Sequence, residues 1–142
     1  MITRNEIYST AYDAIIAQYP SAFISAKFEP VPAGFPAVFI REISNFSTSQ
    51  NMTFSGAQGV KDSTFEVQII SNKTSSPMSE AYGILDVVQV SFGSMYYRTD
   101  AVNVIDDGEN GIYRLRVVFR RVLGAADTLP IASTVSVLNQ GD

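Results

Sequence analysis

Thr64-Phe65-Glu66-Val67-Gln68-Ile69-Ile70 alternates apolar and polar side chains along its whole length. In an extended strand, neighbouring side chains point to opposite faces of the sheet, so the alternation divides this stretch into two faces. The first face carries Phe65, Val67 and Ile69, and the second carries Glu66 and Gln68. The pattern predicts a half-buried β-strand with a core on one side and solvent on the other.

Four further segments have the composition of strands: residues 22–28, 37–43, 96–105 and 112–122. The last two are joined by residues 106–111, whose Asp and Gly residues tolerate the positive φ angles of tight turns, so we expect a β-hairpin. The final strand should bury Tyr113, Leu115, Val117 and Phe119 and turn Arg114, Arg116, Val118 and Arg120 to the other face. In residues 37–43, Val38 and Ile40 should likewise oppose Phe39 and Arg41.

Two segments have the periodicity of amphipathic helices. Near the start, Thr3 is expected to cap a helix with Glu6 completing a capping box, Ile2 packing on Ile7, and Pro20 ending the helix. Its apolar stripe would comprise Ile7, Tyr8, Ala11, Tyr12, Ile15, Ile16 and Tyr19. A second helix should begin with Ser76 as cap and Pro77 at its first position and end at Gly93. Its stripe would comprise Met78, Ala81, Tyr82, Leu85, Val88 and Phe92.

The segments 44–60 and 124–142 fit no helix or buried strand. The first is polar but contains Phe46, Met52 and Phe54, and we interpret it as either an irregular loop or a long β-hairpin arm, which would project in both cases. The second is β-prone but too short to pack alone, so we expect an arm or a late edge strand. The order of elements predicts one α+β domain over residues 1–123 and a C-terminal arm over 124–142. In the domain, two helices would pack on one face of a mostly antiparallel sheet.

The composition of this 142-residue chain disfavours catalysis. It contains no Cys and no His, which removes thiolate chemistry, disulfides and the commonest general base and metal ligand. No phosphate-binding loop or nucleophile motif occurs, so we expect a protein that is not an enzyme and has no cofactor. The net charge of −4 disfavours binding to duplex DNA, because such binding usually needs a basic total charge. No segment has the hydropathy of a membrane span or a signal peptide. We therefore expect a cytoplasmic protein without membrane contact.

Two charged clusters need an interpretation. Asp106, Asp107 and Glu109 could offer oxygen ligands, but they lack the spacing of a calcium loop and lie in the expected hairpin turn, so we predict no metal site there. The positive cluster comprises Arg98, Arg114, Arg116, Arg120 and Arg121. It would form either a solvated strand face, with each Arg paired to a nearby carboxylate, or a surface for another subunit or a partner.

The chain resembles a family of phage proteins in the order of these elements and in several motifs. The motifs are Phe65-Glu66-Val67-Gln68-Ile69-Ile70-Ser71-Asn72-Lys73, Ser79-Glu80-Ala81 with Ile84-Leu85-Asp86-Val87-Val88, Met95-Tyr96-Tyr97-Arg98, and Ile112-Tyr113-Arg114-Leu115-Arg116-Val117-Val118-Phe119-Arg120. Between Val38 and Leu123 the sequence is similar to the tail-terminator or tail-completion proteins of long-tailed bacteriophages, which are sometimes named minor capsid proteins.

This resemblance implies a structural protein of the virion neck that assembles in the host cytoplasm. It would form a homo-oligomeric ring, usually a hexamer, that caps the tail tube, meets the head-side connector protein and surrounds the DNA without reading its sequence. The expected assembly contacts are Phe46, Met52, Phe54, Arg98, Arg114, Arg116 and Arg120. An acidic lumen would let DNA slide, whereas a lumen lined by arginines would hold it.

Three other functions remain open at this point. A head-tail connector or stopper of the same neck would bind the portal and not the tube. A cellular adaptor or ligand-binding domain would be a stable monomer with a concave apolar pocket. An enzyme would lose its activity on substitution of a specific carboxylate such as Asp106 or Asp107.

Overall fold

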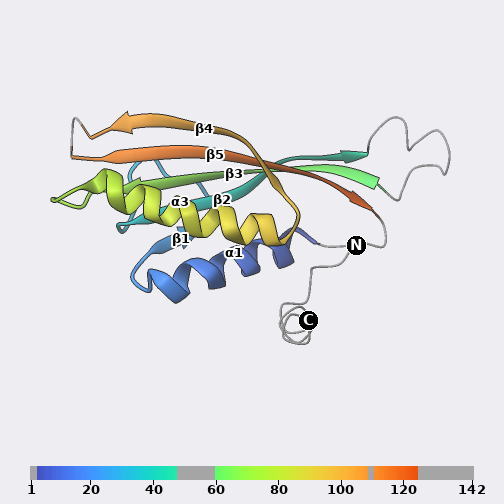
Figure 1. Cartoon of the computed structure of the whole chain (residues 1–142), viewed down its shortest axis with the longest axis horizontal. Helices are drawn as coiled ribbons and strands as arrows, with labels where there is room; N and C mark the ends of the chain where they lie inside the picture. The colour runs from blue at the N-terminus through green and yellow to red at the C-terminus, as the bar shows by residue number, and fades with distance from the viewer. Residues whose placement is uncertain (1–2, 48–59, 109–110, 125–142) are drawn as a thin grey trace, which may run out of the picture.

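Five strands form one sheet in the order β1-β2-β3-β5-β4 (Figure 1). The strands are β1 (Phe23–Ser25), β2 (Ala37–Ser47), β3 (Val60–Ser71), β4 (Arg98–Asp107) and β5 (Tyr113–Gly124). Only the β1–β2 pair is parallel, and the other three pairs are antiparallel. This computed structural model describes residues 3–47, 60–108 and 111–124, without the side chains of 44–47, 60–61 and 122–124.

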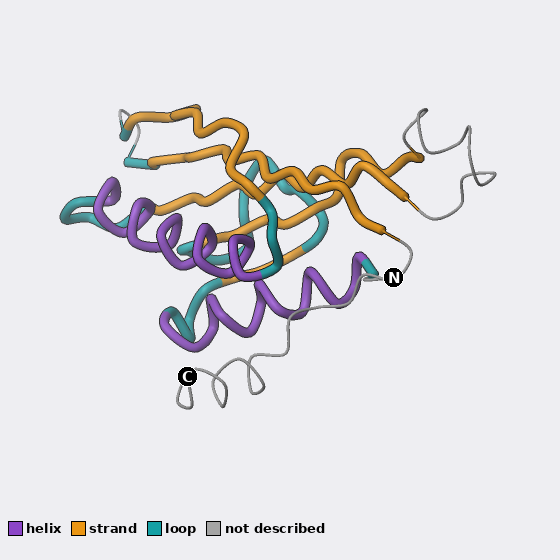
Figure 2. The backbone as a smooth tube through the Cα atoms, turned by 45° about the vertical axis from the view of Figure 1, so that its right-hand side comes forward, coloured by secondary structure: helices purple, strands orange, loops and turns teal. Residues whose placement is uncertain are grey.

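Two helices, α1 (Arg4–Gln18) and α3 (Pro77–Ser94), cover one face of the sheet (Figure 2). The main core lies in this layer and includes the inward residues of β3 and β5 that their alternation predicted. The other face, which we call the open face, carries no helix in the described part of the chain. The predicted α+β fold with two helices on one face is confirmed.

Helix α1 begins as predicted. The Thr3 backbone N–H donates to Glu6 Oε1 at 2.7 Å, and the Glu6 backbone N–H donates to Thr3 Oγ1 at 3.2 Å, which is a complete capping box. The helix buries Ile7, Ala11 and Ile15, while Tyr12 is exposed, so the buried stripe is narrower than expected. The predicted contact of Ile2 lies outside the described residues.

The predictions for the ends of α3 are partly wrong. Ser76 has a left-handed backbone (φ 64°) and makes no side-chain cap, because an N-cap needs an extended backbone for its oxygen to reach the helix N–H groups. Met78 is exposed. At the other end the helix runs past Gly93, and Tyr96 takes the left-handed conformation (φ 67°) that usually selects glycine.

The turn after α3 has the hydrogen bonds of a Schellman motif. The Tyr96 N–H donates to Gly93 O at 3.0 Å, and the Tyr97 N–H donates to Phe92 O at 2.9 Å. The rings of Phe92 and Tyr97 meet edge to face with centroids 5.4 Å apart. Packing of these two rings therefore fixes the helix end, in place of a glycine.

A second, smaller cluster packs on the open face around Phe39 and Ile70. The rings of Phe23 and Phe28 contact Phe39 edge to face at 6.2 and 5.6 Å. The predicted strand over residues 22–28 is shorter than expected, because the chain after Ser25 leaves the sheet to place Phe28 over this cluster.

The sheet continues beyond its edge strands at one end. Strand β1 pairs only with Ala37–Phe39 of β2, and β4 begins at Arg98 opposite Arg120. Residues 44–47, 60–63 and 121–124 therefore form a three-stranded arm with no fourth strand among the described residues (Figure 1). Strand β2 continues to Ser47 and β3 starts at Val60, so both ends of the segment 44–60 are strand, as the hairpin interpretation expected. Met52 and Phe54 lie outside the described residues.

Candidate functional site

Charged side chains line the open face of the sheet in what we call the arginine ladder. Even-numbered positions of β3 and β5 point away from the helices, because odd-numbered positions fill the core. The register then sets Arg41 of β2 directly opposite Glu66 of β3. The ladder comprises Arg41, Arg98, Arg114, Arg116 and Arg120 with Asp62, Glu66, Asp100 and Asp106.

Glu66 lies at the centre of the ladder. Arg41 donates from Nη2 at 2.6 Å and from Nε at 2.8 Å to Glu66 Oε1, and Arg116 donates to Oε2. The carboxylate is only 4% exposed although no helix covers it, because the two arginine side chains shield it. Burial raises the pKa of Glu66, but the hydrogen bonds from Arg41 and Arg116 outweigh burial and hold the pKa below its ordinary value.

Asp62 and Arg120 form a second pair at the base of the arm. Arg120 Nε donates to Asp62 Oδ1 at 3.0 Å and its Nη2 donates to Oδ2, which is the two-point geometry of strong arginine–carboxylate pairs. The hydrogen bond from Arg120 lowers the pKa of Asp62, although burial opposes the shift, and the same bond raises the pKa of Arg120. The pairing expected of a solvated strand face is therefore present here.

Arg114 differs from the other predicted contact residues because its side chain is only 11% exposed. Its guanidinium donates to Asp106 Oδ2 at 3.2 Å, to Gln68 Oε1 at 3.1 Å and to the Pro30 carbonyl at 3.3 Å. It also lies 5.6 Å from the centre of the Phe28 ring. Arg114 thus fastens the segment after β1 to the sheet, while Arg98, Arg116 and Arg120 keep larger exposed surfaces.

The two depressed carboxyl pKa values lead to a prediction about acid stability. Because the folded protein binds fewer protons at Asp62 and Glu66 than the unfolded chain does, their contribution is fully present above the unfolded pKa values of about 4. This stabilising contribution is lost as the pH falls through the lower pKa values that Asp62 and Glu66 have in the folded protein. We expect Asp62→Asn and Glu66→Gln to flatten the decrease in the free energy of unfolding between about pH 5 and pH 2, measured by urea titration.

Asp13→Asn removes a carboxylate from the exposed side of α1 and is the matched control. Equal pH slopes for the wild type and for both ladder variants would contradict the proposed pairing.

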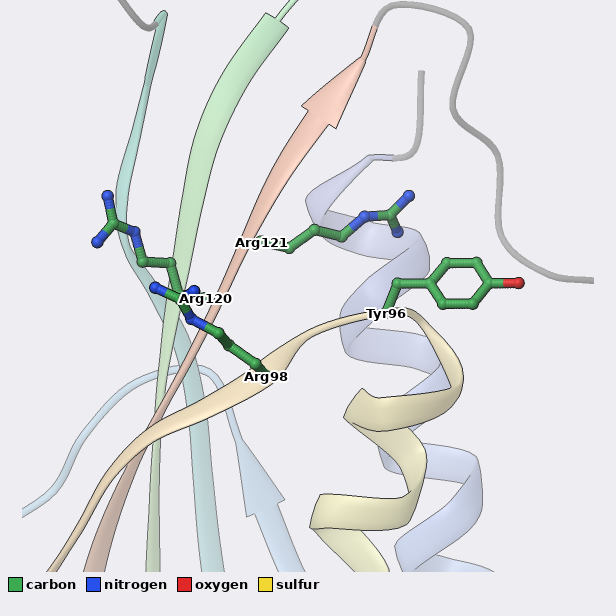
Figure 3. A pocket seen from close by; sticks show the side chains of 4 residues that line it. All are labelled: Tyr96, Arg98, Arg120 and Arg121. Atoms are coloured by element: carbon green, nitrogen blue, oxygen red, sulfur yellow. The ribbon is translucent and has the colours of Figure 1, made fainter.

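A cationic hollow of about 420 Å³ adjoins the ladder where β4 begins. Its described lining is Tyr96, Arg98, Arg120 and Arg121. Figure 3 shows Arg98 and Arg120 extending to one side of the strands and Tyr96 and Arg121 to the other. The Arg121 guanidinium lies 5.4 Å from the centre of the Tyr96 ring and donates to the Met95 carbonyl at 2.6 Å.

Tyr96 is the residue of this hollow that the sequence interpretation missed, because it was assigned to a strand. Its side chain is 68% exposed, and a tyrosine with a left-handed backbone is strained. Strained, exposed residues of this kind are typical of contact sites. The signal available in the sequence was the lack of glycine directly after the helix, followed by two adjacent tyrosines.

Tyr96→Gly tests whether this strain exists. Glycine relieves about 1–2 kcal/mol of left-handed strain and loses roughly 0.5–1 kcal/mol of contact with Arg121, so we expect the free energy of unfolding to rise by up to about 1.5 kcal/mol. Chemical denaturation measures this gain, and Tyr96→Phe is the control that keeps the strain. A loss of stability in Tyr96→Gly would show that the side chain contributes more to the fold than the strain costs.

A buried polar network lies on the helix side of the sheet, next to the arm. The Ser63 hydroxyl donates to Glu42 Oε2 at 3.2 Å and lies 2.8 Å from the Tyr97 hydroxyl. Because the Ser63 hydroxyl donates its one proton to Glu42, its oxygen is free to accept a hydrogen bond from the Tyr97 hydroxyl. Burial raises the pKa of Tyr97 to about 12. These contacts join β2, β3 and the turn after α3 at the base of the arm.

The carboxylates of the β4–β5 turn do not converge. Asp106 lies opposite Arg114 on the open face, and Asp107 lies opposite Tyr113 on the helix side, because consecutive strand residues alternate. Glu109 lies outside the described residues. Within the described ranges, no group of three or more His, Cys, Asp or Glu side chains is placed to hold a metal ion.

Neither described helix has the length and hydropathy needed to cross a membrane. No protein-family model matches this sequence, and no curated protein matches it either.

Proposed function

We propose that this protein is a tail terminator of a long-tailed bacteriophage, forming a homo-oligomeric ring, a hexamer by family resemblance, that caps the tail tube and joins it to the head. The three-stranded arm carries the proposal. It extends past β1 and β4, so its backbone edges lack a described partner, and unpaired edges are suited to joining protein subunits. The sequence resemblance supplies the identity of the assembly.

The contact surface of the proposed ring combines the arm and the cationic hollow. The arm, which begins at Ser44 of β2, leads into the segment with Met52 and Phe54, and the hollow lies beside it at the start of β4. Arg98 and Arg120 keep exposed surface for an acidic group of a neighbour or of the tube protein. Such a protein acts through buried area and shape complementarity, not through a reaction.

The ladder also bears on how the ring would treat DNA. Its named side chains supply five positive and four negative charges, and the arginines are paired within the chain. Phosphate binding requires unneutralised positive charge, so an open face that lined the lumen would bind DNA weakly and let it slide. With the open face toward the lumen, the proposed ring would surround DNA without holding it.

Co-sedimentation tests the choice of partner. The purified protein is incubated separately with tail tubes and with portal-bearing heads, and each mixture is pelleted. We expect the protein in the pellet with tubes that lack their terminator. Pelleting with heads and not with tubes would instead assign the protein to the connector or stopper position.

A further inference from the structure

The outer edge of β2 between Ile40 and Ser47 lacks a described strand partner. Strand β1 pairs with β2 only from Ala37 to Phe39, so the next eight residues present half of their backbone N–H and C=O groups to this edge. An unpaired strand edge of this length is a template for an added strand.

A hollow of about 580 Å³ lies beside this edge, between α1 and β2. It reaches core residues, since Ile40 and Phe65 line it together with Tyr8 and Ala26. Its charged lining residues already have partners, because Arg41 pairs with Glu66, and Glu42 pairs with Arg4 at 3.7 Å and accepts from Ser63. The hollow can therefore take apolar side chains without leaving these charges unpaired.

The other long edge is protected against strand addition. Strand β4 has two bulges, between Thr99 and Ala101 and between Val104 and Asp106, and carries the charges of Arg98, Asp100, Asp106 and Asp107. Bulges and charges are the usual features that stop an edge from pairing. Strand β2 has one such irregularity, between Glu42 and Ser44, against two in β4, and its edge adjoins a hollow that reaches the core, so the edge of β2 is the better acceptor.

Resting on the proposed ring, we propose that residues 131–138 of a neighbouring copy add to this edge as an antiparallel strand. The segment Ile131-Ala132-Ser133-Thr134-Val135-Ser136-Val137-Leu138 has the same eight-residue length as Ile40 to Ser47. Its odd-numbered positions include Ile131, Val135 and Val137, which would face the hollow, and most of its even-numbered positions are small or polar.

We assign the donor to a neighbouring copy because the proposed ring requires contacts between copies of the chain. Strand β5 ends at Gly124 opposite Val60, and β3 lies between β5 and the acceptor strand β2. Donor and acceptor lie on different parts of the chain, which is the arrangement that lets identical subunits join head to tail and close a ring. Residues 125–130 reach at most about 20 Å, so adjacent arms must lie close together.

Disulfide trapping tests this proposal because the chain has no native cysteine. One full-length protein carries Ile43→Cys on the exposed acceptor edge, and a second carries a single cysteine at one of residues 133–137. Any disulfide between the two proteins joins different copies. Ile105→Cys, on the exposed β4 edge, replaces Ile43→Cys in the control mixture.

We expect covalent dimers with Ile43→Cys and none with Ile105→Cys. A third protein carries both cysteines in one chain, and a disulfide that forms only within that chain would overturn the proposal. Equal cross-linking with Ile43→Cys and Ile105→Cys, or no cross-linking with Ile43→Cys, would also overturn it. Electron microscopy of the same samples separates the two claims. Rings without trapping would reject the added strand alone, and trapped dimers that form no rings would reject the proposed ring.

Discussion

Replacing residues 47–59 with a short Gly-Ser turn is expected to abolish ring formation and to leave a folded monomer. The deletion removes Met52 and Phe54 but includes no residue of the main core or of the cluster around Phe39. Light scattering after size exclusion measures the assembly, and circular dichroism with thermal unfolding measures the fold. Tail joining in extracts should fail together with ring formation.

A length-preserving variant separates side chains from chain length. The double variant Met52→Ser, Phe54→Ser keeps the length of the segment but replaces its two large apolar side chains with polar ones, so we expect this variant also to assemble more weakly. Unimpaired rings and tail joining in the deletion variant would show that the segment makes no contact that assembly needs.

Phe92→Ala is expected to lower the free energy of unfolding by about 3–5 kcal/mol. Phe92 is fully buried and stacks on Phe119 with centroids 4.4 Å apart, and the rings of Phe65 and Tyr97 lie 5.6 and 5.4 Å away. Truncation would leave a cavity among three rings, two on β3 and β5 and one in the turn after α3. It would also remove the contact with Tyr97 that closes the end of α3.

Urea titration measures this loss, with Val90→Ala as the control on the exposed side of the same helix. The control should change stability by less than about 0.5 kcal/mol. Since whole domains are stable by only about 5–15 kcal/mol, Phe92→Leu provides a smaller truncation in case Phe92→Ala does not fold. A loss below about 1 kcal/mol in Phe92→Ala would contradict its central place in the core.

The sequence predicted those parts of the fold that one element determines by itself. The alternation in β3 and β5 identified their buried faces, because side-chain direction in a strand depends only on position along it. The capping box of α1 is equally local, and the Thr3 and Glu6 contacts agree with it. These predictions needed no knowledge of neighbouring elements.

Predictions failed where side-chain packing decides the backbone conformation. The end of α3 depends on the packing of Phe92 and Tyr97, so Gly93 was a misleading signal and the left-handed Tyr96 was missed. Strand β1 is short because Phe28 is drawn onto Phe39. Neither contact can be read from local composition.

The sequence predicted which face of the sheet the charged residues of the candidate site occupy, but not which of them form ion pairs. Alternation placed Glu66, Arg116 and Arg120 on one face, yet the burial of Glu66 depends on the register that sets Arg41 opposite it. Cross-strand register arises from three strands together. The hollow beside Tyr96 depends on where β4 begins relative to β5, which the sequence did not indicate.

Negative-stain electron microscopy of the purified protein, with and without tail tubes, tests the assembly function most directly. We expect isolated rings in the protein alone and a ring at one end of each tube that lacks a terminator. A monodisperse monomer that leaves the tube ends bare would contradict the proposed function.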